Sequence, residues 1–235
     1  MSEEHVLCIP RSEFDALGSF QGISLNVDRY LPLLTHPKLE FRPRSSCEKD
    51  PAFKQLIPFH LILRSGRLLR YWRVRGDERL ASRASVGIGG HLNSEDCKQL
   101  QIEAGDLVDA TQMAQAYLVG EGRELSEELE IATPGGIKNM IVGFVNDDES
   151  DEIGTVHLGV IHLVELDDMG GVSSQDPAIE LGGFHSPHDL RFNKVPDCYR
   201  APFDTWSGLI LGNDISSILH GGHGRPYPFF DHASE

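Results

Sequence analysis

Apolar and polar residues alternate along the chain in stretches that predict several β-strands. Two largely apolar stretches flank Ser65-Gly66, which indicates a hairpin whose turn uses the glycine for a positive φ angle. A third stretch runs into Gly89 and Gly90. The strands predicted from this pattern are residues 56–63, 67–74, 83–92, 137–145 and 155–166.

A helical period is clearest at residues 107–129. At 100° per residue, Leu118 and Leu125 fall within about 60° of Ala114, whereas three glutamates lie along one flank of this apolar stripe. A Thr-Pro-Gly-Gly sequence follows and stops the helix. The helices predicted in this way are residues 11–17, 27–34, 107–129 and 203–219.

The acidic flank of the longest helix is the strongest candidate for chemistry. It combines an arginine with closely spaced carboxylates: Arg123, Glu124, Glu127 and Glu128. Carboxylates three and four residues apart repel each other unless a positive charge lies between them, and oxygen ligands suit Mg²⁺. A solvated acidic face is the common alternative. The strand that ends at Gly89-Gly90 favours a site, because a glycine turn precedes the acidic helix.

These residues resemble the signature of the Nudix (MutT-like) hydrolases. That signature is a glycine, five residues, a glutamate, seven residues, then Arg-Glu-hydrophobic-x-Glu-Glu-x-Gly-hydrophobic. The second half matches in register from Arg123 to Ile131, and Gly89-Gly90 are similar to its glycine start. The sequences 55–59, 85–91 and 205–207 are also similar to landmarks of a bacterial subgroup with an insertion in the motif.

The chain departs from the signature at three points. Between Gly90 and Arg123 lie 32 residues, so the resemblance requires an insertion of about 19 residues, placed within residues 93–109. Gln115 stands where the first glutamate of the signature would fall. Glu130 stands where its late glycine would fall.

The resemblance implies an α/β fold: an α/β/α sandwich with a central mixed β-sheet. Residues 1–50 are then an N-terminal extension, 51–220 the Nudix-like domain and 221–235 a flexible tail. The length and the 40% hydrophobic content agree with one substantial core.

The resemblance also implies Mg²⁺-dependent hydrolysis, with Mn²⁺ as a substitute, of a pyrophosphate bond in a nucleoside diphosphate linked to another moiety. One to three cations would bind to Glu124, Glu127 and Glu128, and Arg123 would orient a glutamate. The expected substrate-binding residues are Gly89, Gly90, Arg73, Arg42 and Arg44. The alternative is a catalytically silent module that binds a nucleotide or metabolite, motivated by Gln115 and Glu130.

The net charge indicates which class of partner the protein binds. The chain has a net charge of −15, which disfavours binding of a nucleic acid polymer, so we expect a small phosphorylated substrate. Residues 42–83 nevertheless hold 11 of the 21 basic side chains and only four acids. Arginine suits bidentate phosphate contacts, although a strand arginine is often simply a solvated edge residue.

The remaining signals concern the cellular setting. The sequence has no basic and apolar leader and no apolar run long enough for a membrane span, so we expect a cytoplasmic protein without membrane attachment. Its four cysteines form no Cys-x-x-Cys pair and fit reduced thiols. A homodimer is common among similar proteins, and the sequence leaves the oligomeric state open.

Overall fold

The computed structural model describes residues 3–74, 83–98, 110–150, 152–192, 194–195, 201–213 and 215–219. A mixed sheet dominates these residues, with the central order β12-β5-β4-β10-β9-β2. Its strands are β1 (His5–Pro10), β2 (Gly22–Ser24), β3 (Glu40–Pro43), β4 (Phe53–Arg64), β5 (Arg67–Arg73), β6 (Ala84–Ser85), β7 (Gly87–Gly89), β9 (Lys138–Asn146), β10 (His157–Leu166) and β12 (Ile179–His185). A second, two-stranded sheet pairs β8 (Leu129–Ala132) with β11 (Gly171–Ser174).

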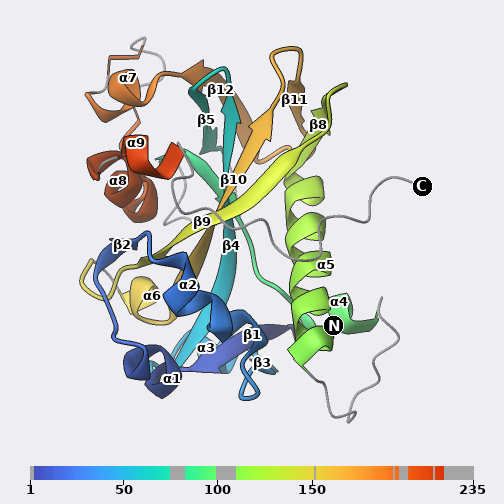
Figure 1. The fold of residues 1–235 in the computed structure, drawn as a ribbon, viewed down its shortest axis with the longest axis vertical. Coiled ribbons are helices and arrows are strands. Elements are labelled where there is room, and N and C mark those ends of the chain that lie inside the picture. Colours follow the sequence, from blue (N-terminus) through green and yellow to red (C-terminus); the bar gives the residue numbers. More distant parts are fainter. Residues whose placement is uncertain are drawn as a thin grey trace.

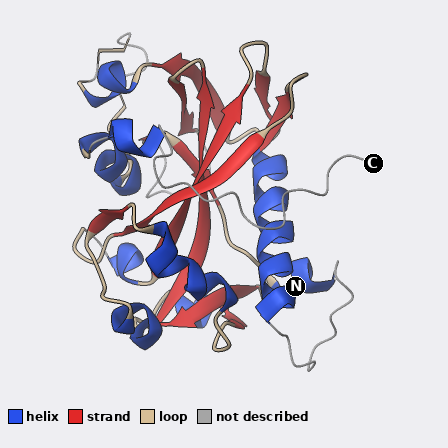
Figure 2. Cartoon of the chain, in the orientation of Figure 1, coloured by secondary structure: helices blue, strands red, loops and turns tan. Residues whose placement is uncertain are grey.

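Helices cover both faces of the sheet (Figures 1 and 2). The helices on the first face are α1 (Arg11–Ala16), α2 (Val27–Tyr30), the 3₁₀ helix η1 (Leu31–Thr35) and α5 (Ala110–Glu128). Those on the second face are α7 (Pro187–Arg191), α8 (Thr205–Gly212) and α9 (Ile215–Leu219). The short helices α3 (Arg44–Cys47), α4 (Ser94–Lys98) and α6 (Glu152–Thr155) lie in connections. The predicted α/β/α sandwich is therefore confirmed.

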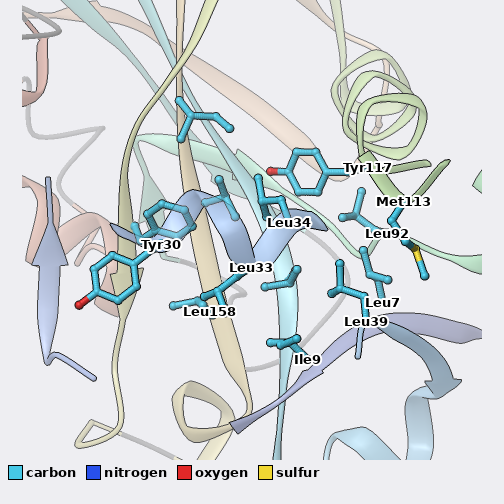
Figure 3. Close-up of a cluster of buried hydrophobic side chains, with 14 of the residues drawn as sticks. Leu7, Ile9, Tyr30, Leu33, Leu34, Leu39, Leu92, Met113, Tyr117 and Leu158 are labelled. Carbon is cyan, nitrogen blue, oxygen red and sulfur yellow. The ribbon is translucent and has the colours of Figure 1, made fainter. Parts of the chain in front are cut away.

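Strand alternation separates the two cores. In β10, Leu158 and Val160 face the first core, whereas Ile161 and Leu163 face the second, because successive side chains of a strand point to opposite faces. In the first core, Leu33 and Leu34 of η1 pack near Met113 and Tyr117 of α5 (Figure 3). The long helix is thus fixed to the sheet by its apolar stripe.

The predicted hairpin is present, and its turn explains the sequence around it. Ser65 and Gly66 both have positive φ angles, 52° and 71°, as a two-residue turn requires. β4 and β5 pair only beside the turn, at Leu63↔Leu68 and Arg64↔Arg67. Beyond it β7 takes the place of β5 and pairs with β4 from Phe59 to Leu61. The glycines that end β7 are thereby held beside the middle of β4.

The N-terminal segment belongs to the same sheet. β1 pairs with both β3 and β4, and β2 pairs with β9. The predicted boundary at residue 50 therefore has strands of one sheet on both sides. The predicted insertion, residues 93–109, contains α4, and residues 99–109 and the predicted tail lie outside the described residues.

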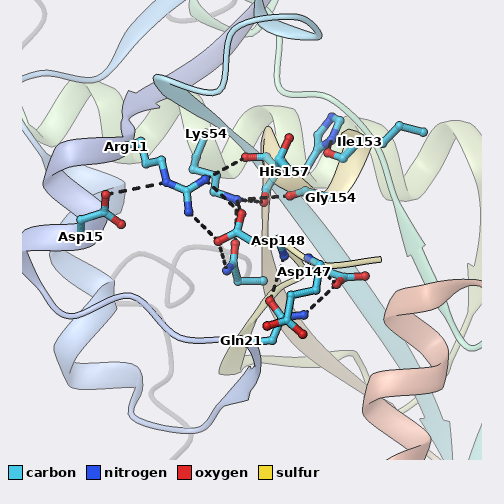
Figure 4. Close-up of polar contacts among 12 residues, drawn as sticks. Arg11, Asp15, Gln21, Lys54, Asp147, Asp148, Ile153, Gly154 and His157 are labelled. Carbon is cyan, nitrogen blue, oxygen red and sulfur yellow. Dashed lines mark hydrogen bonds and ion pairs between the residues drawn. The ribbon is translucent and has the colours of Figure 1, made fainter. Parts of the chain in front are cut away.

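A buried lysine of β4 and an arginine of the N-terminal segment both bind the connection between β9 and β10 (Figure 4). The Lys54 ammonium donates to Asn146 Oδ1 and Asp148 Oδ1, each at 2.7 Å, and to the carbonyls of Gly154 and His157, each at 3.2 Å. Asp148 also accepts from Arg11 at 2.6 Å. Asp148, in the connection that follows β9, therefore has a structural role.

Two boundary predictions change. The predicted helix 203–219 is two helices, α8 and α9, and Leu129 begins β8 instead of ending the long helix. Among the described residues, no helix is long and apolar enough to cross a bilayer. Cys8, Cys47 and Cys97 are free thiols, and Cys198 lies outside the described residues.

Candidate functional site

The C-terminal half of α5 carries the predicted acidic site. The side chains of Glu124 and Glu128 are 14% and 13% exposed, whereas that of Glu127 is 58% exposed. Two of the three predicted ligands therefore turn toward the protein and the third toward solvent. Burial raises the pKa of both Glu124 and Glu128, because a carboxylate loses solvation when it is enclosed.

Gly90 lies directly against Glu124. A Cβ atom built on Gly90 would lie 1.8 Å from Glu124 Oε2. A Cβ on Gly89 would lie 2.5 Å from the carbonyl oxygen of Pro58. The two glycines that the sequence singled out thus allow close approach of backbone to a carboxylate and to β4, and the fold brings them to the acidic helix despite 32 intervening residues.

Arg123 connects three segments around this contact. Its guanidinium donates to Asp96 Oδ1 at 2.7 Å and Oδ2 at 3.1 Å, to the carbonyl of His91 at 3.1 Å, and to Glu124 Oε1 at 2.8 Å. A longer contact of 3.2 Å reaches Glu127. Arg123 therefore orients Glu124, while its bidentate pair with the buried Asp96 secures α4 to α5.

Arg73, at the end of β5, contacts Glu128. Its guanidinium donates to Glu128 Oε1, and it lies 3.6 Å from Asp176. The other oxygen of Glu128, Oε2, is buried and has no hydrogen-bond partner among the described residues. A buried carboxylate oxygen without a donor is costly, so this atom is suited to a cation.

Arg42 and Arg44 have other partners. Arg42 stacks on Phe53 at 3.7 Å and pairs with Glu40 at 3.0 Å. Arg44 pairs with Glu4 at 2.9 Å and Glu48 at 3.0 Å. Both lie in the β3–α3 region, so of the three predicted substrate arginines the structure brings Arg73 alone to a predicted metal ligand.

A buried polar cluster beside the acidic flank was missing from the sequence interpretation. His60 in β4, Glu121 in α5 and His162 in β10 are 0%, 3% and 0% exposed. The two histidines face each other across parallel strands, and their rings lie 5.1 Å apart. Within the described residues, the potential metal-ligand atoms of these three side chains all lie within 4.8 Å of one another. The three predicted ligands Glu124, Glu127 and Glu128 do not form such a group.

The partners of this cluster fix its protonation. His60 Nε2 lies 2.6 Å from Glu121 Oε1, which also accepts from Asn139 at 2.7 Å. Although burial opposes ionisation, the hydrogen bond from His60 and the nearby His162 lower the pKa of Glu121 to about 2. Burial lowers the pKa of His162 to about 3, and its ring contacts Tyr117 at 2.8 Å. The sequence signal was a histidine in the middle of each of two apolar strands.

The suitability of this site for a cation follows from its donor set. Carboxylate oxygens are the ligands that Mg²⁺ and Mn²⁺ take. Glu124 packs against a glycine that leaves no room for a side chain, and Glu128 offers an unpartnered oxygen. The residues present fit a hard divalent cation.

Comparison with known proteins agrees with this architecture. No family model matches the chain. Protein YmaB of Bacillus subtilis (strain 168) is 28% identical over 215 residues, which cover 89% of this chain and 96% of YmaB. The crystal structure of Tm1382, described as a candidate Nudix hydrolase, has a TM-score of 0.66 and 24% identity and covers 92% of this chain and 99% of its own.

A MutT NUDIX hydrolase from Burkholderia pseudomallei also matches, with 18% identity over 67% of this chain and 95% of its own, at a TM-score of 0.41 that is too low to establish a shared fold. The likeness to Tm1382 extends along nearly the whole length of both chains. The chain therefore has the fold of a Nudix hydrolase.

Proposed function

We propose that this protein hydrolyses a pyrophosphate bond in a nucleoside diphosphate linked to another moiety, with Mg²⁺ or Mn²⁺ held by Glu124, Glu127 and Glu128. The observation that carries the proposal is the contact between Gly90 and Glu124, because it rebuilds the two halves of the Nudix-type motif in space. The buried, unpartnered Oε2 of Glu128 supports a cation at the same helix flank.

Each side chain of this site would have a separate role in the reaction. A bound divalent cation neutralises the charge of a diphosphate and lowers the pKa of a water molecule. Arg123 holds Glu124 and reaches Glu127, which fixes the direction of two carboxylates before any ligand arrives. Arg73 borders Glu128, where its guanidinium can also bind a phosphate oxygen.

The charge of the chain agrees with a small anionic substrate. A net charge of −15 repels polyanions, whereas one arginine beside the carboxylates is sufficient to contact a diphosphate. The products would be two phosphorylated fragments.

The first experiment measures cleavage of nucleotide sugars, dinucleoside polyphosphates, ADP-ribose, NADH and nucleoside triphosphates with Mg²⁺ or Mn²⁺, by chromatographic detection of the two phosphorylated products. We expect Glu128→Gln to lower turnover by roughly 10- to 100-fold or more while the protein stays folded. Glu130→Gln is the matched control, because it removes the same charge two residues away, from an exposed side chain that bonds Ser173 and Gln175. Equal turnover in wild type and Glu128→Gln would reject the assignment of this residue.

A second function, the silent binding module, is favoured by Gln115. This residue replaces the first glutamate of the signature and is exposed on α5. Two measurements on the same panel separate the two functions: a silent module binds a nucleotide in calorimetry but cleaves no member of the panel into phosphorylated products.

A further inference from the structure

The two halves of the candidate site lie far apart in the sequence. Gly89 ends β7 and Gly90 follows it, the acidic residues lie in α5, and residues 91–122 separate the two halves. With so many residues between them, no single short turn fixes the distance from the glycines to the acidic residues of α5. Contacts between side chains must hold the two halves together.

His60 contacts both halves. Its Nδ1 lies 3.1 Å from the carbonyl oxygen of Ile88, two residues before Gly90, and its Nε2 lies 2.6 Å from Glu121 Oε1, three residues before Glu124. Both neighbours are hydrogen-bond acceptors, so each ring nitrogen of His60 faces an acceptor at hydrogen-bonding distance. The side chains of His60 and Glu121 are 0% and 4% exposed, so water does not compete for these bonds.

The geometry is that of a hydrogen-bonded bridge. Two ligands of one tetrahedral ion at about 2.0–2.1 Å lie roughly 3.3 Å apart. The 2.6 Å separation between His60 Nε2 and Glu121 Oε1 is shorter and matches a charge-assisted hydrogen bond. Asn139, which donates to the same Glu121 oxygen at 2.7 Å, completes the network without an ion.

We propose that His60 is a positioning residue that holds the glycine strand and the acidic helix together, so that the intervening insertion does not disturb the contact between Gly90 and Glu124. The expected effect of His60 on cation binding rests on the proposed function. The bridge that His60 forms between the two segments does not depend on that function.

Rigid elements transmit the effect over short distances. Three helical residues advance about 4.5 Å, less than one turn, so Glu124 moves with Glu121. Ile88 lies within β7, which is paired with β4, the strand of His60 itself. The close packing of Gly90 on Glu124 leaves little room for a shift of either segment.

Arg123 supplies a second link nearer the surface. It donates to the carbonyl of His91 and to Glu124, but its side chain is 18% exposed. Because both bonds of His60 are fully enclosed whereas Arg123 is partly exposed to water, we expect the loss of His60 to separate the segments more.

The test compares His60→Asn with His162→Asn. The control is matched, because His162 lies opposite His60 in the parallel register and is equally buried. It has hydrogen bonds to Tyr117 and Asn139 and lies 3.7 Å from Glu121 Oε1, beyond hydrogen-bonding distance, but has no bond to Ile88. Hydrogen–deuterium exchange is measured on peptides covering residues 86–92 and 121–128. We expect exchange at both segments to rise at least tenfold in His60→Asn and to stay near wild type there in His162→Asn.

A second readout is the affinity for Mg²⁺ by calorimetry. His60→Asn should weaken it at least tenfold, and His162→Asn should not. Protection that falls equally in both variants, or that stays unchanged in His60→Asn, would overturn the proposal. If His60→Asn does not fold, Glu121→Gln, which keeps the volume and removes the charge, is judged by the same exchange criterion against His162→Asn.

The outcomes also separate this inference from the proposed function. A wild type without Mg²⁺ affinity or turnover contradicts the proposed function, and the exchange experiment still decides whether His60 bridges the segments. A stoichiometric transition metal in the purified protein, detected by mass spectrometry and lost in both histidine variants, would instead identify the cluster as a metal site and overturn the bridge.

Discussion

At the scale of single residues, the absence of a side chain is as informative as its presence. Gly90 matters because its backbone touches the carboxylate of Glu124, and Glu128 because one of its oxygens has no donor. Arg42 and Arg44 were predicted from composition, yet their partners are acids near the N-terminus. A sequence shows which residues are basic but not which acids lie within reach of them.

The variant Gly90→Ala tests the contact between Gly90 and Glu124. The added methyl would collide with the flexible end of Glu124, so the free energy of unfolding should change by only ~1 kcal/mol, while the affinity for Mg²⁺ should fall about 10- to 100-fold. Calorimetry measures the affinity and urea unfolding the stability. The control is Gly122→Ala on α5, where a Cβ meets nothing within 4 Å and helix propensity should stabilise the protein slightly. Undiminished affinity in Gly90→Ala would show that Glu124 is not a ligand.

At the scale of elements, periodicity predicted most segments and missed how they are anchored. The helix expected at residues 203–219 is broken, and its first part, α8, is held by a buried cap. Asp204 Oδ1 accepts from the backbone N–H of Ser207 at 2.8 Å, and Ser207 Oγ accepts from Val86 at 3.0 Å. This network joins α8 to the strand region that leads to Gly90.

The substitution Asp204→Ala should therefore lower the free energy of unfolding more than the loss of an ordinary N-cap residue does. We expect a loss of about 2 kcal/mol in the free energy of unfolding, since both the cap and the buried partner Ser207 lose a bond. Ser186→Ala is the control, because Ser186 caps α7 through the same pair of bonds, but its partner Asp189 is 44% exposed and can bond to water instead. Its expected cost is ~1 kcal/mol. Equal costs in the two variants, measured by urea unfolding, would show that the Asp204 network adds nothing beyond capping.

At the scale of the whole molecule, the buried charges make stability depend on pH. Burial lowers the pKa of His162 from 6.5 to about 3, so the unfolded chain binds a proton that the folded chain excludes. Stability should therefore fall as the pH drops from about 6.5 toward 3. Glu121, with its pKa lowered from 4.5 to about 2, adds a further loss between those two values.

Urea unfolding midpoints between pH 7 and pH 4 test this dependence. Below pH 6.5 the free energy of unfolding should change more steeply with pH in wild type than in His162→Asn. The difference should reach roughly 1.4 kcal/mol per pH unit, which corresponds to the uptake of one proton on unfolding. His188→Asn is the control, since the side chain of His188 is 62% exposed. Parallel pH profiles for wild type and His162→Asn would contradict the assigned burial of a neutral His162.

The sequence by itself determined the central strands β4, β5, β9 and β10, the long helix, the acidic flank and the resemblance to the Nudix signature, whereas β1, β2, β3 and β12 were not predicted. Those features are local, because periodicity and motif spacing reflect the geometry of a few consecutive residues. Tertiary structure alone decided that Gly90 meets Glu124 across 32 residues, that Arg73 reaches Glu128, and that two strand histidines converge on Glu121. Such contacts depend on strand register and helix placement, which the packing of the whole core sets.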